Sequence, residues 1–115
     1  MSYLRNPKKL LENTFSFLEN DFAKQVYTRN QEIDLVFSNN VAKVAIMYDL
    51  GMDWKYHIDI SIEKCGVQKN LLDCYGLFGE VKLKEFKLQI EGKKVENQIA
   101  IYGEFLSENI QKLTS

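Results

Sequence analysis

The residues best suited to acid–base chemistry are the chain's single histidine and an aspartate two positions later. His57 and Asp59 lie in a segment where apolar and polar residues alternate, so both side chains point to one face of a predicted strand. A histidine beside a carboxylate can serve as a general base. No recognisable motif ties a nucleophile to this pair, and we therefore interpret His57 as a surface histidine on a strand.

The residues that could bind a metal or a phosphate group are few and scattered. Cys65 and Cys74 are separated by eight residues and form no CxxC motif, whereas a transition-metal site needs several suitable ligands. Asp49, Asp53 and Asp73 do not have the pattern of a calcium-binding loop, and glycine-rich phosphate loops are absent. We expect reduced structural thiols, no metal, no cofactor and no enzymatic activity.

Length and composition indicate one globular domain over residues 1–115. The chain is long enough for one hydrophobic core, and 45% of its residues are hydrophobic. A net charge of −1 gives no strong attraction to nucleic acid or to an anionic membrane. The first residues lack the apolar stretch of a signal peptide, and no apolar run approaches the length of a membrane span. We therefore expect a cytoplasmic protein.

Two amphipathic helices are predicted, one over about 7–24 and one over about 94–113. Asn6 and Pro7 suit the cap and first position of the earlier helix. Apolar residues follow at helical spacing in both segments, as Leu11, Phe15, Leu18 and Phe22 and then as Val95, Ile99, Tyr102, Leu106, Ile110 and Leu113. Gly103 costs the second helix about 1 kcal/mol relative to alanine, which suggests close packing on a sheet.

Three strands are predicted between the helices, at about 32–38, 41–48 and 54–63. The last segment is the clearest, because its apolar and polar residues alternate strictly. A type I′ turn at Asn39-Asn40 would pair Phe37 with Ala42. A loop over 49–53 would then pair Tyr48 with Trp54 and Lys43 with Asp59, and would align Asp34, Ala45 and His57 in one row.

The region after the third strand has a weaker pattern. A short helical turn is predicted over 70–78. Residues 81–90 fit either a strand or a helix, and we favour a fourth, edge strand because lysines alternate with its apolar residues. The sequence thus predicts an α+β fold of element order α-β-β-β-(α)-β-α. Its antiparallel meander of three or four strands would pack against the two helices as a two-layer sandwich.

The outward face of the meander is the candidate binding surface. Val36, Val41, Ala45 and Met47 form a modest apolar cluster among charged residues on this face. Such a patch can mark a protein-interaction site, although scattered apolar residues are also ordinary on a sheet surface. The candidate protein-binding residues are Asp34, Val36, Lys43, Met47, Lys55, His57, Asp59 and Glu63.

A family resemblance spans most of the chain. It is carried by apolar residues of the opening helix (Leu11, Phe15, Phe17, Leu18, Phe22), by the strands Val36-Phe37 and Val44-Ala45-Ile46-Met47-Tyr48-Asp49, and by Tyr102, Phe105, Leu106, Asn109 and Ile110 of the closing helix. In these features the chain resembles the small bacterial immunity proteins of contact-dependent growth inhibition. The resemblance implies a non-enzymatic protein that binds and neutralises a cognate toxin domain.

Two other functions remain open from the residues. The first is a small-ligand-binding protein or enzyme, with a pocket between helices and sheet lined by Trp54, Tyr56 or Tyr102. The second is a subunit that only dimerises through its sheet face. We expect a protein partner, no nucleic-acid or membrane partner, and a monomer or a homodimer.

Overall fold

The computed structural model describes residues 6–30, 32–52, 54–71 and 80–114, with the side chains of α3 described from Lys84 onward. Its helices are α1 (Pro7–Thr14), the 3-10 helix η1 (Ser16–Asn20), α3 (Glu80–Ile90) and α4 (Val95–Thr114). Its strands are β1 (Ala23–Arg29), β2 (Glu32–Ser38), β3 (Ala42–Leu50), β4 (Tyr56–Lys64) and β5 (Val67–Asn70).

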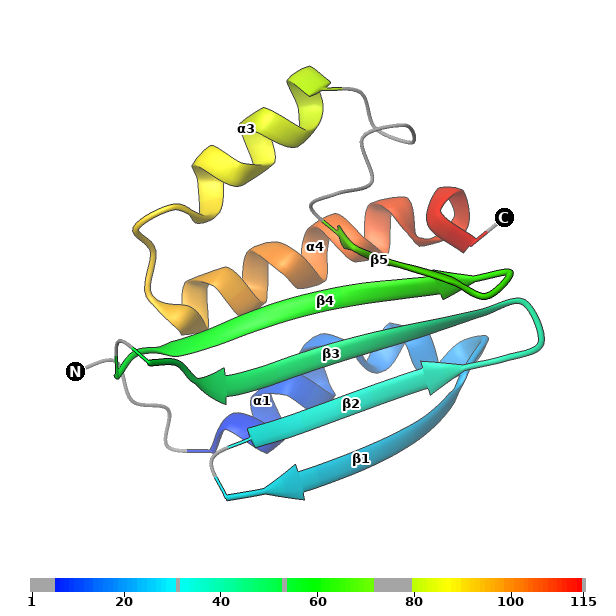
Figure 1. Cartoon of the computed structure of the whole chain (residues 1–115), viewed down its shortest axis with the longest axis horizontal. Coiled ribbons are helices and arrows are strands. Elements are labelled where there is room, and N and C mark those ends of the chain that lie inside the picture. Colours follow the sequence, from blue (N-terminus) through cyan, green and yellow to red (C-terminus); the bar gives the residue numbers. More distant parts are fainter. Residues whose placement is uncertain (1–5, 31, 53, 72–79, 115) are drawn as a thin grey trace.

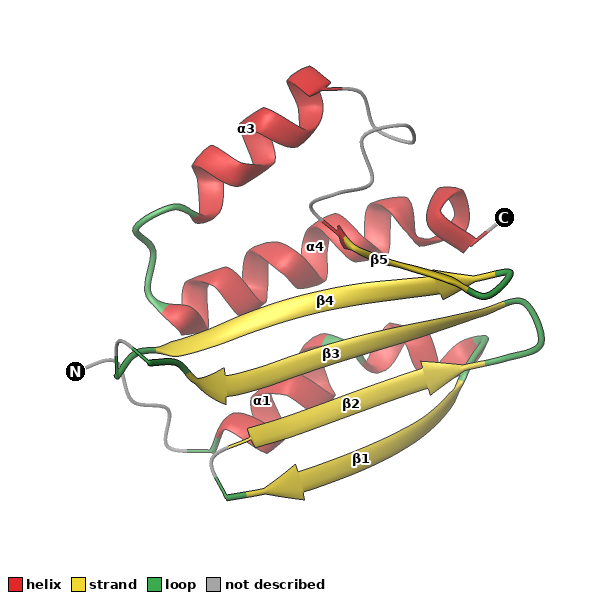
Figure 2. Ribbon diagram, viewed as in Figure 1, coloured by secondary structure: helices red, strands yellow, loops and turns green. Residues whose placement is uncertain are grey.

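The five strands form one antiparallel sheet in the order β1-β2-β3-β4-β5. Helices α1 and α4 lie across the same face of this sheet, and α3 packs against α4 (Figures 1 and 2). This arrangement confirms the predicted α+β fold, including the three-stranded meander and both terminal helices. The sheet is wider than predicted, because β1 and β5 extend it at both edges.

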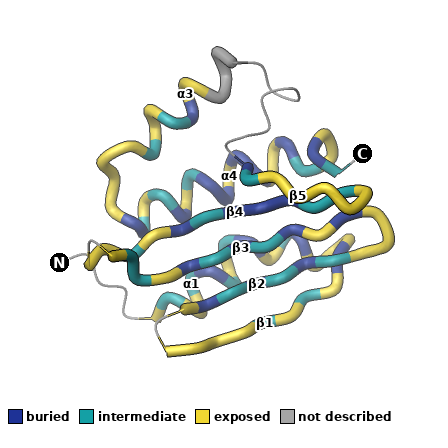
Figure 3. The backbone as a smooth tube through the Cα atoms, in the orientation of Figure 1, coloured by how far each residue is buried: buried dark blue, intermediate teal, exposed yellow. Residues whose placement is uncertain are grey.

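Alternation along the strands separates the core from the opposite face of the sheet. Buried positions alternate with half-buried or exposed ones along β2 and β3, whereas β1 and β5 have no buried residue (Figure 3). The helices cover the apolar face with the residues that their spacing predicted. The fully buried side chains include Leu11, Phe15, Leu18, Leu35, Phe37, Ile46, Tyr48, Ile60, Ile99 and Leu106.

The predicted helix over 7–24 is shorter in the structure. Its start is confirmed, since Asn6 Oδ1 accepts a hydrogen bond from the Lys9 N–H at 3.2 Å. The helix ends at Thr14, and η1 then carries the chain into β1. The apolar stripe is still buried, with Leu11 in α1, Leu18 in η1, and Phe15 and Phe22 in the residues that follow these helices. Helical continuation fails because β1 pairs with β2 along its whole length.

A lysine on the core-facing side ties the edge strand β1 to the helices. Lys24 stands opposite Phe37 in the sheet. Its Nζ lies 3.3 Å from Glu12 Oε1 and 3.5 Å from Glu19 Oε1. Partial burial opposes ionisation of Glu12, but hydrogen bonds and charges from Lys8 and Lys24 outweigh it and lower the pKa of Glu12. An inward-pointing charge of this kind discourages pairing of the edge with another chain.

The β2–β3 turn differs from the predicted one by two positions. Phe37 stands opposite Val44 rather than Ala42. The side chain of Asn39 fixes the turn, because its Oδ1 accepts from the N–H groups of Val41 (2.8 Å) and Ala42 (2.9 Å). This side-chain turn replaces the expected positive φ at Asn39-Asn40. Each strand residue keeps its predicted face, since a shift of two preserves the alternation.

The β3–β4 register differs from prediction by four positions. Lys43 stands opposite Glu63 rather than Asp59, with Nζ 3.8 Å from Glu63 Oε2. The reason is that β3 continues to Leu50, which adds pairs before the chain turns. The Gly51 N–H donates to the Lys55 carbonyl at 2.8 Å and closes this turn. Trp54, predicted in the core opposite Tyr48, is instead 80% exposed at φ 63°.

The predicted edge strand over 81–90 is wrong, because this segment is the helix α3. Phe86 is buried and Leu88 is largely exposed, a pattern that strand alternation cannot produce for residues two apart. The additional edge strand is instead β5, reached through a tight turn in which Cys65 and Gly66 both have positive φ. The helical turn predicted over 70–78 falls largely outside the described residues, and Asn70 itself ends β5.

Gly103 allows close packing of α4 against α1, rather than against the sheet as expected. A Cβ atom at this position would lie 2.5 Å from Thr14 Cγ2. Real Cβ contacts are longer than this, so any side chain here must displace the threonine methyl group. The glycine therefore weakens the helix locally and permits the contact between the two helices.

We predict that Gly103→Ala destabilises the fold by about 1 kcal/mol, because overpacking of about 1–3 kcal/mol outweighs a helix-propensity gain of about 1 kcal/mol. Thr14→Ser removes the obstructing methyl group, and in that background Gly103→Ala should be neutral or stabilising. Urea unfolding of the wild type, both single variants and the double variant measures the coupling. Additive effects would contradict the proposed contact.

Candidate functional site

The sheet face opposite α1 and α4, here called the outer face, gathers most of the predicted binding residues. The strand register arranges its side chains in rows that cross the sheet. These rows are Ala23–Ser38–Lys43–Glu63–Gln68, Gln25–Val36–Ala45–Ser61–Asn70 and Tyr27–Asp34–Met47–Asp59. The two middle strands therefore place apolar side chains at the centre of the face and charged ones around them.

The outer face contains a hollow of about 510 Å³. Small side chains, Ala45 and Ser61, lie in its middle row, and the longer Gln25 and Tyr27 lie on the edge strand. Val36 stands opposite Ala45 on β2, Met47 follows two residues later on β3, and both are half-buried. The residues that line the hollow are Gln25, Tyr27, Asp34, Val36, Ser38, Lys43, Ala45, Met47, Ser61, Glu63 and Gln68.

Charge on the outer face is predominantly acidic. By register and alternation the acidic residues are Glu32, Asp34, Asp49, Asp59 and Glu63, and the basic ones are Arg29 and Lys43. Partial burial raises the pKa of Asp34, and the negative charges of Glu32 and Asp49 raise it further. The ionised carboxylate of Asp34 is therefore held in an unfavourable environment in this structure.

His57 and Asp59 do not form a catalytic arrangement with Asp34. His57 stands opposite Asp49, whereas Asp34 stands opposite Met47, so the predicted Asp34–Ala45–His57 row is wrong. One oxygen of Asp59 accepts hydrogen bonds from the Ile60 N–H at 3.0 Å and from the amide of Asn70. Asp59 thus helps to hold β5 on the sheet.

Five of the eight candidate binding residues line the hollow, and the others lie beside it. Asp34, Val36, Lys43, Met47 and Glu63 line it. Asp59 is in the row of Met47, His57 is further along β4, and Lys55 lies in the β3–β4 turn. Sequence reasoning missed Gln25 and Tyr27 because it missed β1. The run Val26-Tyr27-Thr28, rich in β-branched and aromatic residues, was the available signal.

The three aromatic residues predicted to line a ligand pocket do not converge on a cavity. Trp54 is exposed, and Tyr56 stacks on Tyr48 with ring centroids 5.1 Å apart. Tyr102 is buried and makes a T-shaped contact with Phe86, with ring centroids 5.3 Å apart. Burial is the main factor that raises the pKa of Tyr102 to about 12, so this phenol stays protonated at neutral pH.

Within the described ranges, no group of three or more histidine, cysteine, aspartate or glutamate side chains is placed to hold a metal ion. Cys65 is exposed in the β4–β5 turn, and Cys74 lies outside the described residues. No helix in the described part of the chain is long and apolar enough to cross a membrane.

Comparisons with protein-family models, with curated proteins and with solved structures find no match to this chain.

We predict that Asp34→Asn stabilises the isolated protein at neutral pH, by less than about 1 kcal/mol because the group is partly solvated. The pKa of Asp34 is higher in the folded state than the ordinary value of 3.8, so folding favours the protonated side chain. Its contribution to the free energy of unfolding is therefore complete below pH 3.8 and is lost as pH rises through the folded-state pKa. Thermal unfolding should therefore show equal stability well below pH 3.8 and a more stable variant above it. Glu91→Gln, away from the outer face, is the control. A less stable asparagine variant at neutral pH would contradict this description of Asp34.

Proposed function

We propose that this protein is a non-enzymatic binding module whose outer face binds a protein partner. The observation that supports this most directly is the hollow between β1 and β5, where half-buried Val36, Ala45 and Met47 lie inside a charged rim and no described helix or strand covers them. A small apolar centre with a polar rim is the usual organisation of a protein-binding surface. The central apolar side chains would supply affinity, and the surrounding charges would supply orientation.

The size of the outer face suits such a role. Nine residues of β3 at about 3.3 Å each, across five strands about 4.8 Å apart, span about 30 by 19 Å, or roughly 570 Å² in projection. A stable interface buries about 800 Å² on each partner. The contact area of the face exceeds its projected area because side chains project from the sheet, and the adjoining β3–β4 turn would add the rest of the buried area. That turn presents Met52 and Trp54, both largely exposed.

The partner that we propose is a bacterial toxin domain, which the protein would bind and neutralise in the cytoplasm as an immunity protein. The support for this is the resemblance to contact-dependent growth inhibition immunity proteins, together with the acidic excess on the outer face. Opposite charge on a partner would steer association and fix its orientation. On this proposal, the protein acts by covering the partner's surface, and its own side chains perform no chemistry.

The test uses a toxin-like C-terminal domain encoded immediately upstream in the native genome, titrated calorimetrically with this protein. We predict that Val36→Thr combined with Met47→Gln weakens binding by roughly tenfold or more, because near-isosteric polar groups replace the apolar centre. Leu88→Gln is the control, since it replaces an exposed apolar residue on α3, away from the outer face, and should leave affinity unchanged. The single tryptophan, Trp54, reports binding independently by a change in fluorescence.

Three results would contradict the proposed function. One is that the Val36/Met47 double variant binds the partner as tightly as the wild type does, while the Leu88 variant binds it more weakly. Another is an unrelated metabolic operon in place of a secreted toxin gene. The third is a doubled mass in solution that the double variant abolishes, because it would assign the outer face to self-association.

A further inference from the structure

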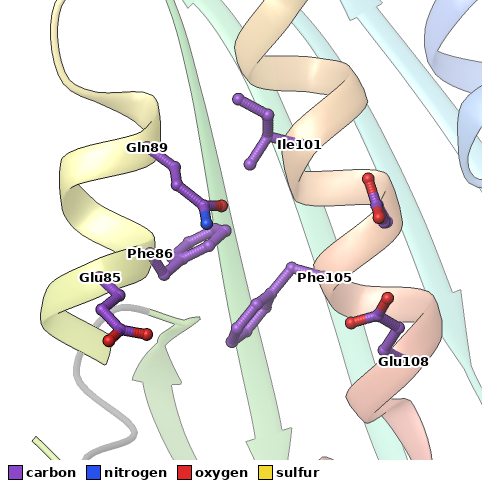
Figure 4. A pocket seen from close by; sticks show the side chains of 7 residues that line it. Glu85, Phe86, Gln89, Ile101, Phe105 and Glu108 are labelled. Atoms are coloured by element: carbon purple, nitrogen blue, oxygen red, sulfur yellow. The ribbon is translucent and has the colours of Figure 1, made fainter. Parts of the chain in front are cut away.

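A recess of about 240 Å³ lies between α3 and α4 and is separate from the outer face. Figure 4 shows Glu85, Phe86 and Gln89 projecting from α3, and Ile101, Phe105 and Glu108 projecting from α4, around the space between the helices. Glu104 of α4 completes the lining. Pockets for drug-sized ligands are mostly larger, at about 300–1,000 Å³. The recess therefore suits one long side chain.

The floor of the recess is aromatic and well fixed. The rings of Phe86 and Phe105 stack with centroids 4.1 Å apart and an interplanar angle of 30°. The ring of Tyr102 makes a T-shaped contact with that of Phe86. Both phenylalanines are more than nine-tenths buried, so their positions are set by packing. Ile101 adds a half-buried aliphatic wall.

The rim of the recess is acidic and lacks cationic partners among the described residues. Glu85 faces the recess from α3, and Glu104 and Glu108 face it from successive turns of α4. The described ion pairs are those of Lys8 and Lys24 with Glu12, Lys24 with Glu19, and Lys43 with Glu63. The three glutamates of the recess take part in none of them. Negative charge thus surrounds an apolar floor.

We propose that this recess docks an arginine side chain of a protein partner. The aliphatic stem of arginine would lie on Phe105 and Ile101, and its guanidinium group would reach the carboxylates of the rim. A planar guanidinium can donate parallel hydrogen bonds to carboxylates and lie against aromatic rings, whereas a lysine ammonium is a strongly hydrated point charge. Charge complementarity and the paired phenylalanines therefore both favour arginine.

This site does not depend on the proposed function of the outer face, because it lies in the helix layer on the other side of the sheet. The two proposals can consequently fail independently. Perturbations in an NMR experiment would fall on α3 and α4 for the recess, and on the strands for the outer face.

The experiment is an NMR titration of the full chain with the capped peptide Gly-Arg-Gly, and with matched peptides carrying citrulline or lysine in place of arginine. We expect saturable shifts at residues 85–89 and 101–108 with the arginine peptide, at least threefold weaker binding of lysine, and no saturation with citrulline. Glu85→Gln, Glu104→Gln and Glu108→Gln should each weaken arginine binding about three- to fivefold. Glu91→Gln, which removes an exposed charge outside the recess, should leave it unchanged.

Equal binding of lysine and arginine would overturn the assignment to arginine, since it would show attraction by charge alone. Shifts confined to the strands, or equal effects of Glu91→Gln and the recess variants, would overturn the site itself. All four substitutions are at exposed positions, and each variant's unperturbed spectrum verifies that it is folded.

Discussion

The structure depends on the burial of one face of a twisted antiparallel sheet. Alternation along β2, β3 and β4 places Leu35, Phe37, Val44, Ile46, Ile58 and Ile60 on that face. Removing apolar surface from water contributes about 25 cal/mol per Å² to stability, and a covering layer is needed to remove this face from water. Helices α1 and α4 supply this layer, and Gly103 lets them approach each other closely. Because the covering layer lies on one side, the outer face carries no packing requirement of comparable strength. The residues of the outer face can therefore be selected for binding a partner.

The sequence predicted correctly those elements that the spacing of apolar residues determines. The bounds of β2 and the apolar stripe of α4 agree with prediction, and so does the cap at Asn6. Both register errors, of two and four positions, were even. Every side chain on β2, β3 and β4 therefore stayed on its predicted face while its cross-strand partner changed. This is why most candidate residues of the outer face meet around one hollow although the predicted pairs did not form.

The remaining elements were missed because their physical determinants are not periodic. Strand β1 has no fully buried position, and its sequence shows no regular alternation of apolar and polar residues. The side-chain turn at Asn39 and the extension of β3 to Leu50 each depend on a few local hydrogen bonds. Helix α3 owes its position to the stacking of Phe86 on Phe105, a contact between residues far apart in the chain. The recess between α3 and α4 follows from that contact and could not be located before it was known.

Methyl NMR tests most directly whether the outer face is the binding surface that we propose. The partner domain would be added to protein labelled at alanine, valine, isoleucine and methionine methyl groups. We predict that the methyl signals of Val36, Ala45 and Met47 shift on complex formation, while those of Val44 and Ile46, on the helix-covered face of the same strand, do not. Shifts confined to methyl groups of the helices, such as Ile101 and Ile110, with Val36, Ala45 and Met47 unmoved, would contradict the claim.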